Sequence, residues 1–236
     1  MGSQSPPAVR AAATVVVLRP RPSEPEPELF MLRRSSKSAF MPDALVFPGG
    51  AVEAEDAGPE GHFDDPAHAR AAQRECLEEA KLAVELERLH WFDTWLTPSG
   101  ESPRRFLARF YVTTIAADQG HDAEADGRET RAGRWASAAE ILAAWEREEV
   151  DLPPPTLCVL LQLRSGAWRA WTELDGEQVR TPILPKIAAL GSDIHIVMPH
   201  DPGYDALPGD AAPAPSRATS LPQRFARRGK RWLPLA

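Results

Sequence analysis

The sequence is poor in cysteine and has no long apolar run. Its two cysteines, Cys76 and Cys158, both lie in apolar helical patterns and show no metal-type spacing. This usage predicts neither a disulfide framework nor a zinc site. Apolar runs such as residues 11–18 are far shorter than the ~20 residues of a membrane span, and the first residues lack the apolar stretch of a secretory leader. We therefore expect a soluble protein of a reducing compartment, by default the cytoplasm.

Basic residues are outnumbered by acids. The chain has 27 Lys and Arg against 34 Asp and Glu, a formal net charge of −7, which argues against a general nucleic-acid binder. From residue 217 to the end the balance reverses, with six basic residues and no acid: Arg217, Arg224, Arg227, Arg228, Lys230 and Arg231. A solvated tail and a tail that touches phosphates are the two interpretations. The acidic remainder suits a site that collects metal cations.

Hydrophobic patterning predicts alternating strands and helices. Residues 1–9 are expected to be a flexible lead, residues 10–210 a single domain with a C-terminal extension, and residues 211–236 an Ala/Pro linker and basic tail. Strands are expected at residues 11–18, 29–33, 86–96, 105–115, 131–135 and 194–198, and helices at 65–81, 138–148, 156–164 and 167–174. The acidic, Gly- and Pro-containing stretch 57–64 predicts an irregular loop. This order indicates a layered α/β sandwich with a mixed sheet.

One predicted helix carries three acids on one side. In the run Arg74-Glu75-Cys76-Leu77-Glu78-Glu79, the three glutamates fall within an arc of about 100°. Like charges so close together repel one another unless a cation lies among them. Carboxylate oxygens suit Mg²⁺ or Mn²⁺, which bind carboxylates together with substrate phosphates. A solvated acidic face is the alternative, and the helix alone does not decide between the two.

The residues before the helix favour the metal site. Gly49-Gly50 follow Phe47-Pro48, Asp56 comes six residues after Gly50, and seventeen residues separate Asp56 from Arg74. The arrangement resembles the box of the Nudix (MutT-like) hydrolase family, G-x5-E-x7-R-E-U-x-E-E-x-G-U, where U is apolar. This chain departs from the box in three ways: Asp56 replaces the first glutamate, the spacer is longer by ten residues, and Lys81 replaces the later glycine.

The resemblance implies a Nudix-type α/β/α sandwich with a mixed sheet and a metal-dependent pyrophosphatase activity. It implies that Glu75, Glu78 and Glu79 hold the metal, that Glu75 and Glu79 also take part in catalysis, and that Arg74 orients the glutamates. Gly49 and Gly50 would let the backbone approach the phosphates. Glu129 matches a downstream acid that serves as a base or additional ligand, with a surface-loop acid as the alternative.

The long spacer resembles a branch of the family that includes peroxisomal coenzyme A diphosphatases. Segments similar to that branch are residues 32–34 with 39–50, Trp95–Pro98 with Arg104-Arg105-Phe106, and Leu152–Thr156. Coenzyme A or an acyl derivative is then the expected substrate, while ADP-ribose, dinucleotides and NDP-sugars remain open. Arg104 and Arg105 are candidates for holding phosphates and Trp95 for stacking on adenine; the alternatives are strand-edge charges and a core aromatic.

A binding module that senses a nucleotide without turnover is the rival function. Family members of that kind usually lose box glutamates, whereas all three are present here, so the enzyme is favoured. The expected ligand is a small nucleoside diphosphate derivative, with no membrane or nucleic-acid partner. The oligomeric state stays open, a homodimer included.

Overall fold

The main sheet is built around the β-branched segment near the N-terminus. The computed structural model describes residues 8–37, 41–58, 64–99, 104–127 and 130–235. Within these ranges the main sheet has seven strands: β1 (Val9–Arg19), β2 (Glu28–Arg34), β3 (Leu45–Val46), β4 (Gly49–Ala51), β5 (His90–Leu96), β6 (Arg105–Thr114) and β7 (Thr130–Ser137). Strand β1 runs parallel to β6 and antiparallel to β2 and β4, so the sheet is mixed, as predicted.

Strand β1 has two different neighbours along one edge. It pairs with β2 only at Leu18 and Arg19, whereas Ala12, Ala13 and Thr14 pair with the short strand β4. The amide of Val15 donates to the carbonyl of Pro48 between the two pairings. As a result β4 lies beside the N-terminal half of β1 and brings its two glycines under helix α1 (Asp65–Ala80).

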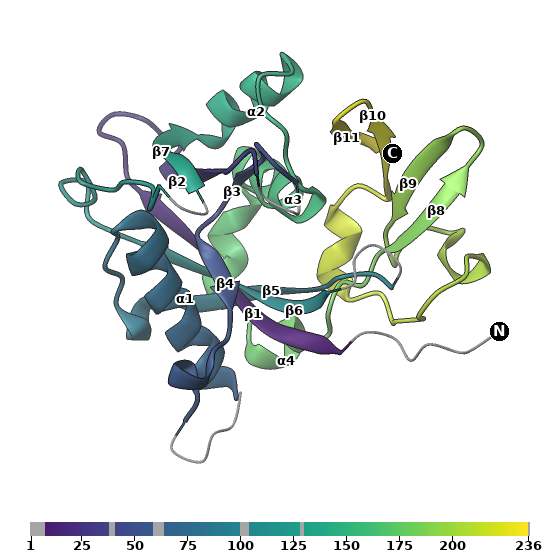
Figure 1. Ribbon diagram of the computed structural model, residues 1–236, viewed down its shortest axis with the longest axis horizontal. Coiled ribbons are helices and arrows are strands. Elements are labelled where there is room, and N and C mark those ends of the chain that lie inside the picture. The colour runs from purple at the N-terminus through teal and green to yellow at the C-terminus, as the bar shows by residue number, and fades with distance from the viewer. Residues whose placement is uncertain (1–7, 38–40, 59–63, 100–103, 128–129, 236) are drawn as a thin grey trace.

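Helix α1 covers one face of the main sheet (Figure 1). Its buried stripe consists of small side chains: Ala67, Ala71, Ala72, Cys76 and Ala80. These pack against Ala13, Val15 and Val17 of β1, and small side chains let a helix approach a sheet closely. The prediction of a closely packed helix is confirmed. The sequence favours Asp65 as its N-cap, whereas the N-cap is Asp64, so the helix begins one residue earlier, at Asp65.

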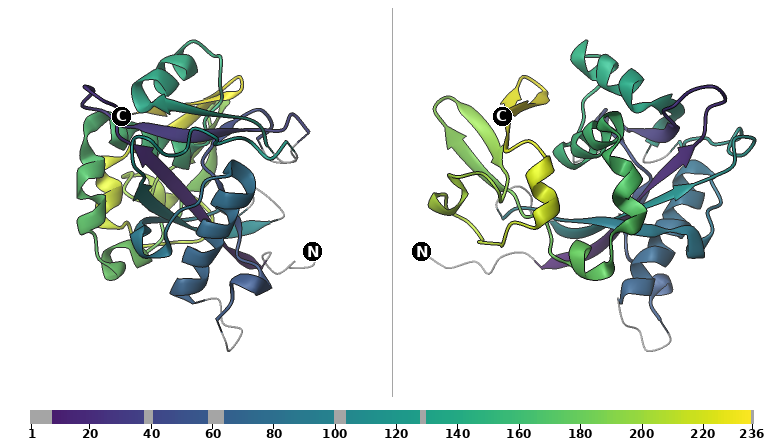
Figure 2. Two further views of the ribbon diagram at one scale, coloured as in Figure 1. Left: turned by 90° about the vertical axis from the view of Figure 1, so that its left-hand side faces the viewer. Right: turned by 180° about the vertical axis from the view of Figure 1, so that it is seen from behind.

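The opposite face carries the larger apolar cluster. Helices α2 (Ala138–Glu146) and α3 (Pro154–Ser165) pack there against residues that alternate with the α1-facing ones along the strands, such as Val16, Leu18 and Phe110. Figure 2 shows these helices and α1 on different sides of the sheet. None of the described helices has the length and continuous apolar character needed to cross a lipid bilayer.

A second sheet follows the third long helix. After a 3-10 segment (Ala167–Glu173) and the short helix α4 (Gly176–Arg180), the chain forms β8 (Lys186–Leu190), β9 (Asp193–Val197), β10 (Arg224–Arg228) and β11 (Arg231–Leu235) in the order β11-β10-β9-β8. Of these, only β9 was predicted. The expected helix over 167–174 is a 3-10 segment, and the expected strand over 86–96 begins at His90 after a 3-10 turn.

The interpretation of the basic segment as a solvated tail is wrong for the described residues 216–235, whereas residues 211–215 have no helix or strand, as expected of a linker. Strands β10 and β11 form a hairpin that extends the second sheet through β9. Five arginines of this segment have acidic partners from the rest of the chain: Arg217 with Asp93, Arg224 with Asp201, Arg227 with Asp151, Arg228 with Asp193 and Arg231 with Glu148. The tail folds because the acidic excess of the preceding residues neutralises it.

Candidate functional site

Both ends of α1 are set by local sequence. At the start, the Asp64 carboxylate accepts a hydrogen bond from the Ala67 amide at 2.9 Å, and Pro66 occupies the first turn, where a missing N–H does no harm. At the end, Lys81 adopts φ 55° and ψ 25°, and its amide donates to the Leu77 carbonyl at 3.0 Å. This left-handed geometry explains why the family prefers glycine at the position of Lys81.

The acidic side of α1 lies against the two glycines of β4. The amide of Gly49 donates to Glu79 Oε2 at 3.0 Å. A Cβ added to Gly50 would lie 2.3 Å from Glu75 Oε1, far inside any normal contact. Only glycine at this position therefore lets the Glu75 carboxylate reach the strand backbone.

Arg74 is the central cation of this site. Its Nη1 donates to Glu75 Oε1 at 2.8 Å and to Glu78 Oε2 at 3.1 Å. Its Nε and Nη2 donate to the two oxygens of Asp56 at 3.1 and 2.8 Å, and Nη2 also donates to the carbonyl of Ala51 at 3.0 Å. One guanidinium thus connects two box glutamates to the acid at the start of the box, in the forked geometry that favours Arg over Lys.

The Asp56 carboxylate is held in its charged form. Its residue is only 3% exposed, and burial alone would raise its pKa. The hydrogen bonds and charge of Arg74, together with the Glu53 amide, outweigh burial and lower the pKa of Asp56 below its ordinary value. In return, the Asp56 hydrogen bond raises the pKa of Arg74, with burial opposing and Glu75 adding to the rise. The pair is a fixed ionic anchor for the helix face.

The site fits a hard divalent cation in ligand type. Mg²⁺ and Mn²⁺ prefer carboxylate oxygens, and Glu75, Glu78 and Glu79 supply three carboxylates from one helix face. In the described part of the chain, no three acidic, histidine or cysteine side chains converge as a preformed metal site. Arg74 bonds both Glu75 and Glu78, and Glu79 accepts from Gly49.

Three other predicted binding residues lie away from this cluster. Trp95 is 4% exposed, and its indole N–H donates to Asp93 at 2.9 Å, so it is a core aromatic. Arg105 is also buried; it donates to the Thr97 carbonyl at 3.0 Å and pairs with Asp210 at 2.9 Å. The structure thus gives Arg105 protein partners in place of a phosphate. Arg104 is exposed just before β6.

Two further predictions concern residues that lie wholly or partly outside the described ranges. Glu129 lies outside them. In the spacer, Ala57, Gly58 and Asp64 have no helix or strand, whereas residues 59–63 are also outside the described ranges. The role of Asp56 as anchor of Arg74 was not anticipated from the sequence; the signal was its place in the box, where this chain has the shorter acid.

The fold and site define a class of protein before any comparison: a mixed-sheet α/β sandwich whose acidic helix packs on a Gly-Gly strand. The family model described as NUDIX domain matches residues 8–154. This match covers more than half of the chain, and the chain therefore belongs to the NUDIX family, the family of Nudix hydrolases.

Solved structures agree on the fold. A NUDIX hydrolase from Alicyclobacillus acidocaldarius has a TM-score of 0.56 and 24% identity, over 66% of this chain and 91% of that one. The NUDIX domain of Shewanella oneidensis NrtR, solved in complex with ADP ribose, has a TM-score of 0.50 and 13% identity, over 68% and 89% of the two chains.

Two curated relatives match parts of the sequence. A Caenorhabditis elegans protein designated nudix hydrolase 7 is 25% identical over 202 residues, which cover 70% of this chain. The acyl-coenzyme A diphosphatase NUDT19 of Gallus gallus is 47% identical over 55 residues, 20% of this chain. The matches span 65% of the nematode protein and 15% of the chicken protein.

Proposed function

We propose that this protein is a divalent-metal-dependent hydrolase that cleaves a pyrophosphate linkage in a nucleoside diphosphate derivative. The observation that carries the proposal is the contact of the acidic helix face with the Gly49-Gly50 backbone, through Glu79 and Glu75. A solvated acidic face has no reason to pack on two glycines that leave no room for a side chain. A site that brings metal-held phosphates up to a strand does.

In this proposal Glu75, Glu78 and Glu79 hold Mg²⁺ or Mn²⁺. When bound, such an ion would neutralise the charge of the pyrophosphate, orient it and lower the pKa of a nearby water. Arg74 bridges Glu75 and Glu78 and holds them in place, because Asp56 and the Ala51 carbonyl fix its guanidinium from the other side. Glu79 and Glu75 are also the proposed catalytic carboxylates, and Glu129 is a further candidate for proton transfer.

Coenzyme A or an acyl derivative is the proposed substrate. The short but 47% identical match to the chicken acyl-coenzyme A diphosphatase supports it, as do the segments Trp95–Pro98 and Leu152–Thr156 noted in the sequence. Coenzyme A carries a 3′-phosphate that ADP-ribose lacks. Arg104, which is exposed just before β6, is the residue proposed to meet it, whereas Arg105 is buried.

Product analysis tests the proposal. The protein is incubated with coenzyme A, 3′-dephospho-coenzyme A and ADP-ribose in Mg²⁺, with and without chelator, and products are identified by mass spectrometry. We expect 4′-phosphopantetheine and 3′,5′-ADP from coenzyme A, and no product with chelator. A charge-assisted contact to the 3′-phosphate predicts a kcat/KM about ten- to a hundredfold higher than for the dephospho form.

The outcomes separate the parts of the proposal. If ADP-ribose gives the highest kcat/KM, or the dephospho form equals coenzyme A, the substrate is wrong while the pyrophosphatase stands. Binding of these nucleotides without any product in either Mg²⁺ or Mn²⁺ would instead favour the sensing module.

A further inference from the structure

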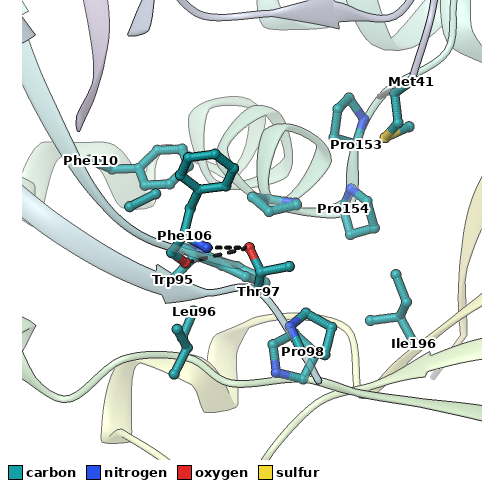
Figure 3. A pocket seen from close by; sticks show the side chains of 13 residues that line it. Met41, Trp95, Leu96, Thr97, Pro98, Phe106, Phe110, Pro153, Pro154 and Ile196 are labelled. Carbon is teal, nitrogen blue, oxygen red and sulfur yellow. Dashed lines mark hydrogen bonds between the residues drawn. The ribbon is translucent and has the colours of Figure 1, made fainter. Parts of the chain in front are cut away.

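An apolar cavity of about 150 Å³, whose lining side chains are drawn in Figure 3, lies on the face of the main sheet opposite α1. Much of its wall comes from segments whose sequences resemble the coenzyme A diphosphatase branch: Met41, Trp95–Pro98, Phe106 and Pro153–Pro155. These segments are far apart along the chain and converge on one space. The convergence indicates that the segments share a single function.

Residues beyond the NUDIX match, which ends at residue 154, form part of the cavity wall. Pro185, just before β8, and Ile196 of β9 line it from the second sheet, and Ala108 and Phe110 line it from β6. The cavity therefore lies between the NUDIX domain and the C-terminal extension of this chain.

The described lining offers almost no hydrogen bonds to an occupant. Its prolines have no backbone N–H. The Thr97 hydroxyl already accepts from the Phe106 amide at 3.1 Å (Figure 3), and the indole N–H of Trp95 donates to Asp93. A nucleobase needs partners for its polar edge and loses affinity when they are absent. A hydrocarbon group needs none, so the lining favours a hydrocarbon.

The cavity lies at a defined distance from the candidate catalytic site. Ala13 of β1 pairs with Gly50 on one side and with Arg109 on the other, so Ala108 and Phe110 are two strands away from the glycines. Two strand spacings are about 10 Å. In the described sheet, β4 pairs with β1 alone, so no further strand separates its outer edge from the opposite face. A substituent that reaches from Gly50 to the cavity must be long.

We propose that this cavity receives the hydrocarbon end of the substrate and selects acyl chains of up to about six carbons. The inference rests on the proposed function, because it takes the pyrophosphate to lie at Gly49-Gly50. The size follows from the volume, since an apolar cavity of about 150 Å³ holds one benzene-sized group. Several prolines make the wall stiff, so little conformational freedom is lost on binding.

Chain-length selectivity tests the inference. The kcat/KM values of coenzyme A and its acetyl, butyryl, hexanoyl and decanoyl thioesters are measured under one Mg²⁺ condition. Each buried methylene should raise kcat/KM about fourfold, so hexanoyl should exceed butyryl by about 15-fold. The gain should stop near six carbons, and it should appear in KM.

Two variants with opposite effects remove the ambiguity of misfolding. Ala108→Leu fills part of the cavity and should move the optimum to shorter chains, whereas Phe106→Ala enlarges it and should move the optimum to longer ones. Ala189→Leu, the same change at an exposed position of β8, should leave the wild-type profile. General destabilisation cannot shift the optimum in both directions.

The overturning results are distinct from those of the proposed function. If all thioesters are cleaved with equal kcat/KM, or both cavity variants keep the wild-type optimum, the acyl site is wrong while the hydrolase stands. If the two cavity variants instead change the preference among substrates that carry another base in place of adenine, the cavity binds the base. If none of these coenzyme A compounds is cleaved although ADP-ribose is, both the proposed substrate and the acyl site are wrong while the pyrophosphatase stands.

Discussion

Replacing Arg217 by methionine should lower the free energy of unfolding by about 3–5 kcal/mol at pH 7. Arg217 Nε donates to Asp93 Oδ1 at 2.7 Å, and its Nη atoms donate to the carbonyls of Gln178 and Thr181 at 2.8 and 2.7 Å. Asp93 is only 3% exposed. Methionine keeps the volume but leaves a buried carboxylate without its cation. For a chain of this size the melting temperature should fall by roughly 6–20 °C.

The loss should depend on pH in a defined direction. Burial raises the pKa of Asp93, although Arg217, Trp95 and the Thr94 amide oppose the rise. An acid with a higher pKa in the folded state binds more protons there, so its contribution to stability falls as pH rises. Without Arg217 the folded-state pKa rises further. The penalty of R217M should therefore shrink as pH is lowered toward the ordinary aspartate pKa of 3.8.

Urea unfolding at about pH 5 and pH 7 measures both effects in wild type, R217M, D93N and the double variant. The double variant should regain much of the stability lost in R217M, because the uncompensated charge is gone. Arg217→Lys, which keeps the charge but not the forked donors, should be intermediate. The reasoning is refuted if the free energy of unfolding of R217M lies within about 0.5 kcal/mol of the wild-type value, or if the penalty grows toward pH 5.

Three further predictions concern the candidate active site. Glu79→Gln should reduce turnover by about a hundredfold or more, because the carboxylate is lost. The melting temperature should stay unchanged, because the amide oxygen still accepts from Gly49. Unchanged turnover would favour the alternative that the acids form only a solvated face. Lys81→Gly should raise the free energy of unfolding by about 0.5–1 kcal/mol in urea titration, since φ 55° suits glycine; a loss would contradict this. Asp56→Asn should lower the free energy of unfolding above about pH 5. Because a lowered pKa gives stability that is lost on protonation, this deficit should vanish in acid titrations below pH 3.8. A pH-independent deficit would exclude an ionic anchor.

Helix α1 could be predicted because its signals are local. An N-cap, a proline in the first turn and acids at helical spacing all lie within one short segment, and tertiary contacts do not alter them. The central strands β1 and β6 were equally clear from their β-branched and apolar runs. The contact of Glu75 with Gly50 was not predicted, because the two residues are 25 positions apart along the chain.

The roles of the arginines outside the box could not be predicted. The sequence does not distinguish an arginine that is solvated from one that binds phosphate or pairs with a buried acid, and the partners of the arginines in this chain are distant in sequence. Arg105 pairs with Asp210, and Arg217 with Asp93. The second sheet was missed for a related reason: its strands are five residues long and too short for a clear alternation.

The pairing of Arg217 with Asp93 also bears on the order of events during synthesis. The two residues are 124 positions apart, and ribosomes add about 5–20 residues per second, so the carboxylate is made about 6–25 s before its guanidinium. Throughout that interval the Asp93 side chain is better protonated or hydrated than buried as an unpaired anion. The β5 edge of the nascent sheet therefore reaches its final packing only after the segment around Arg217 has been translated.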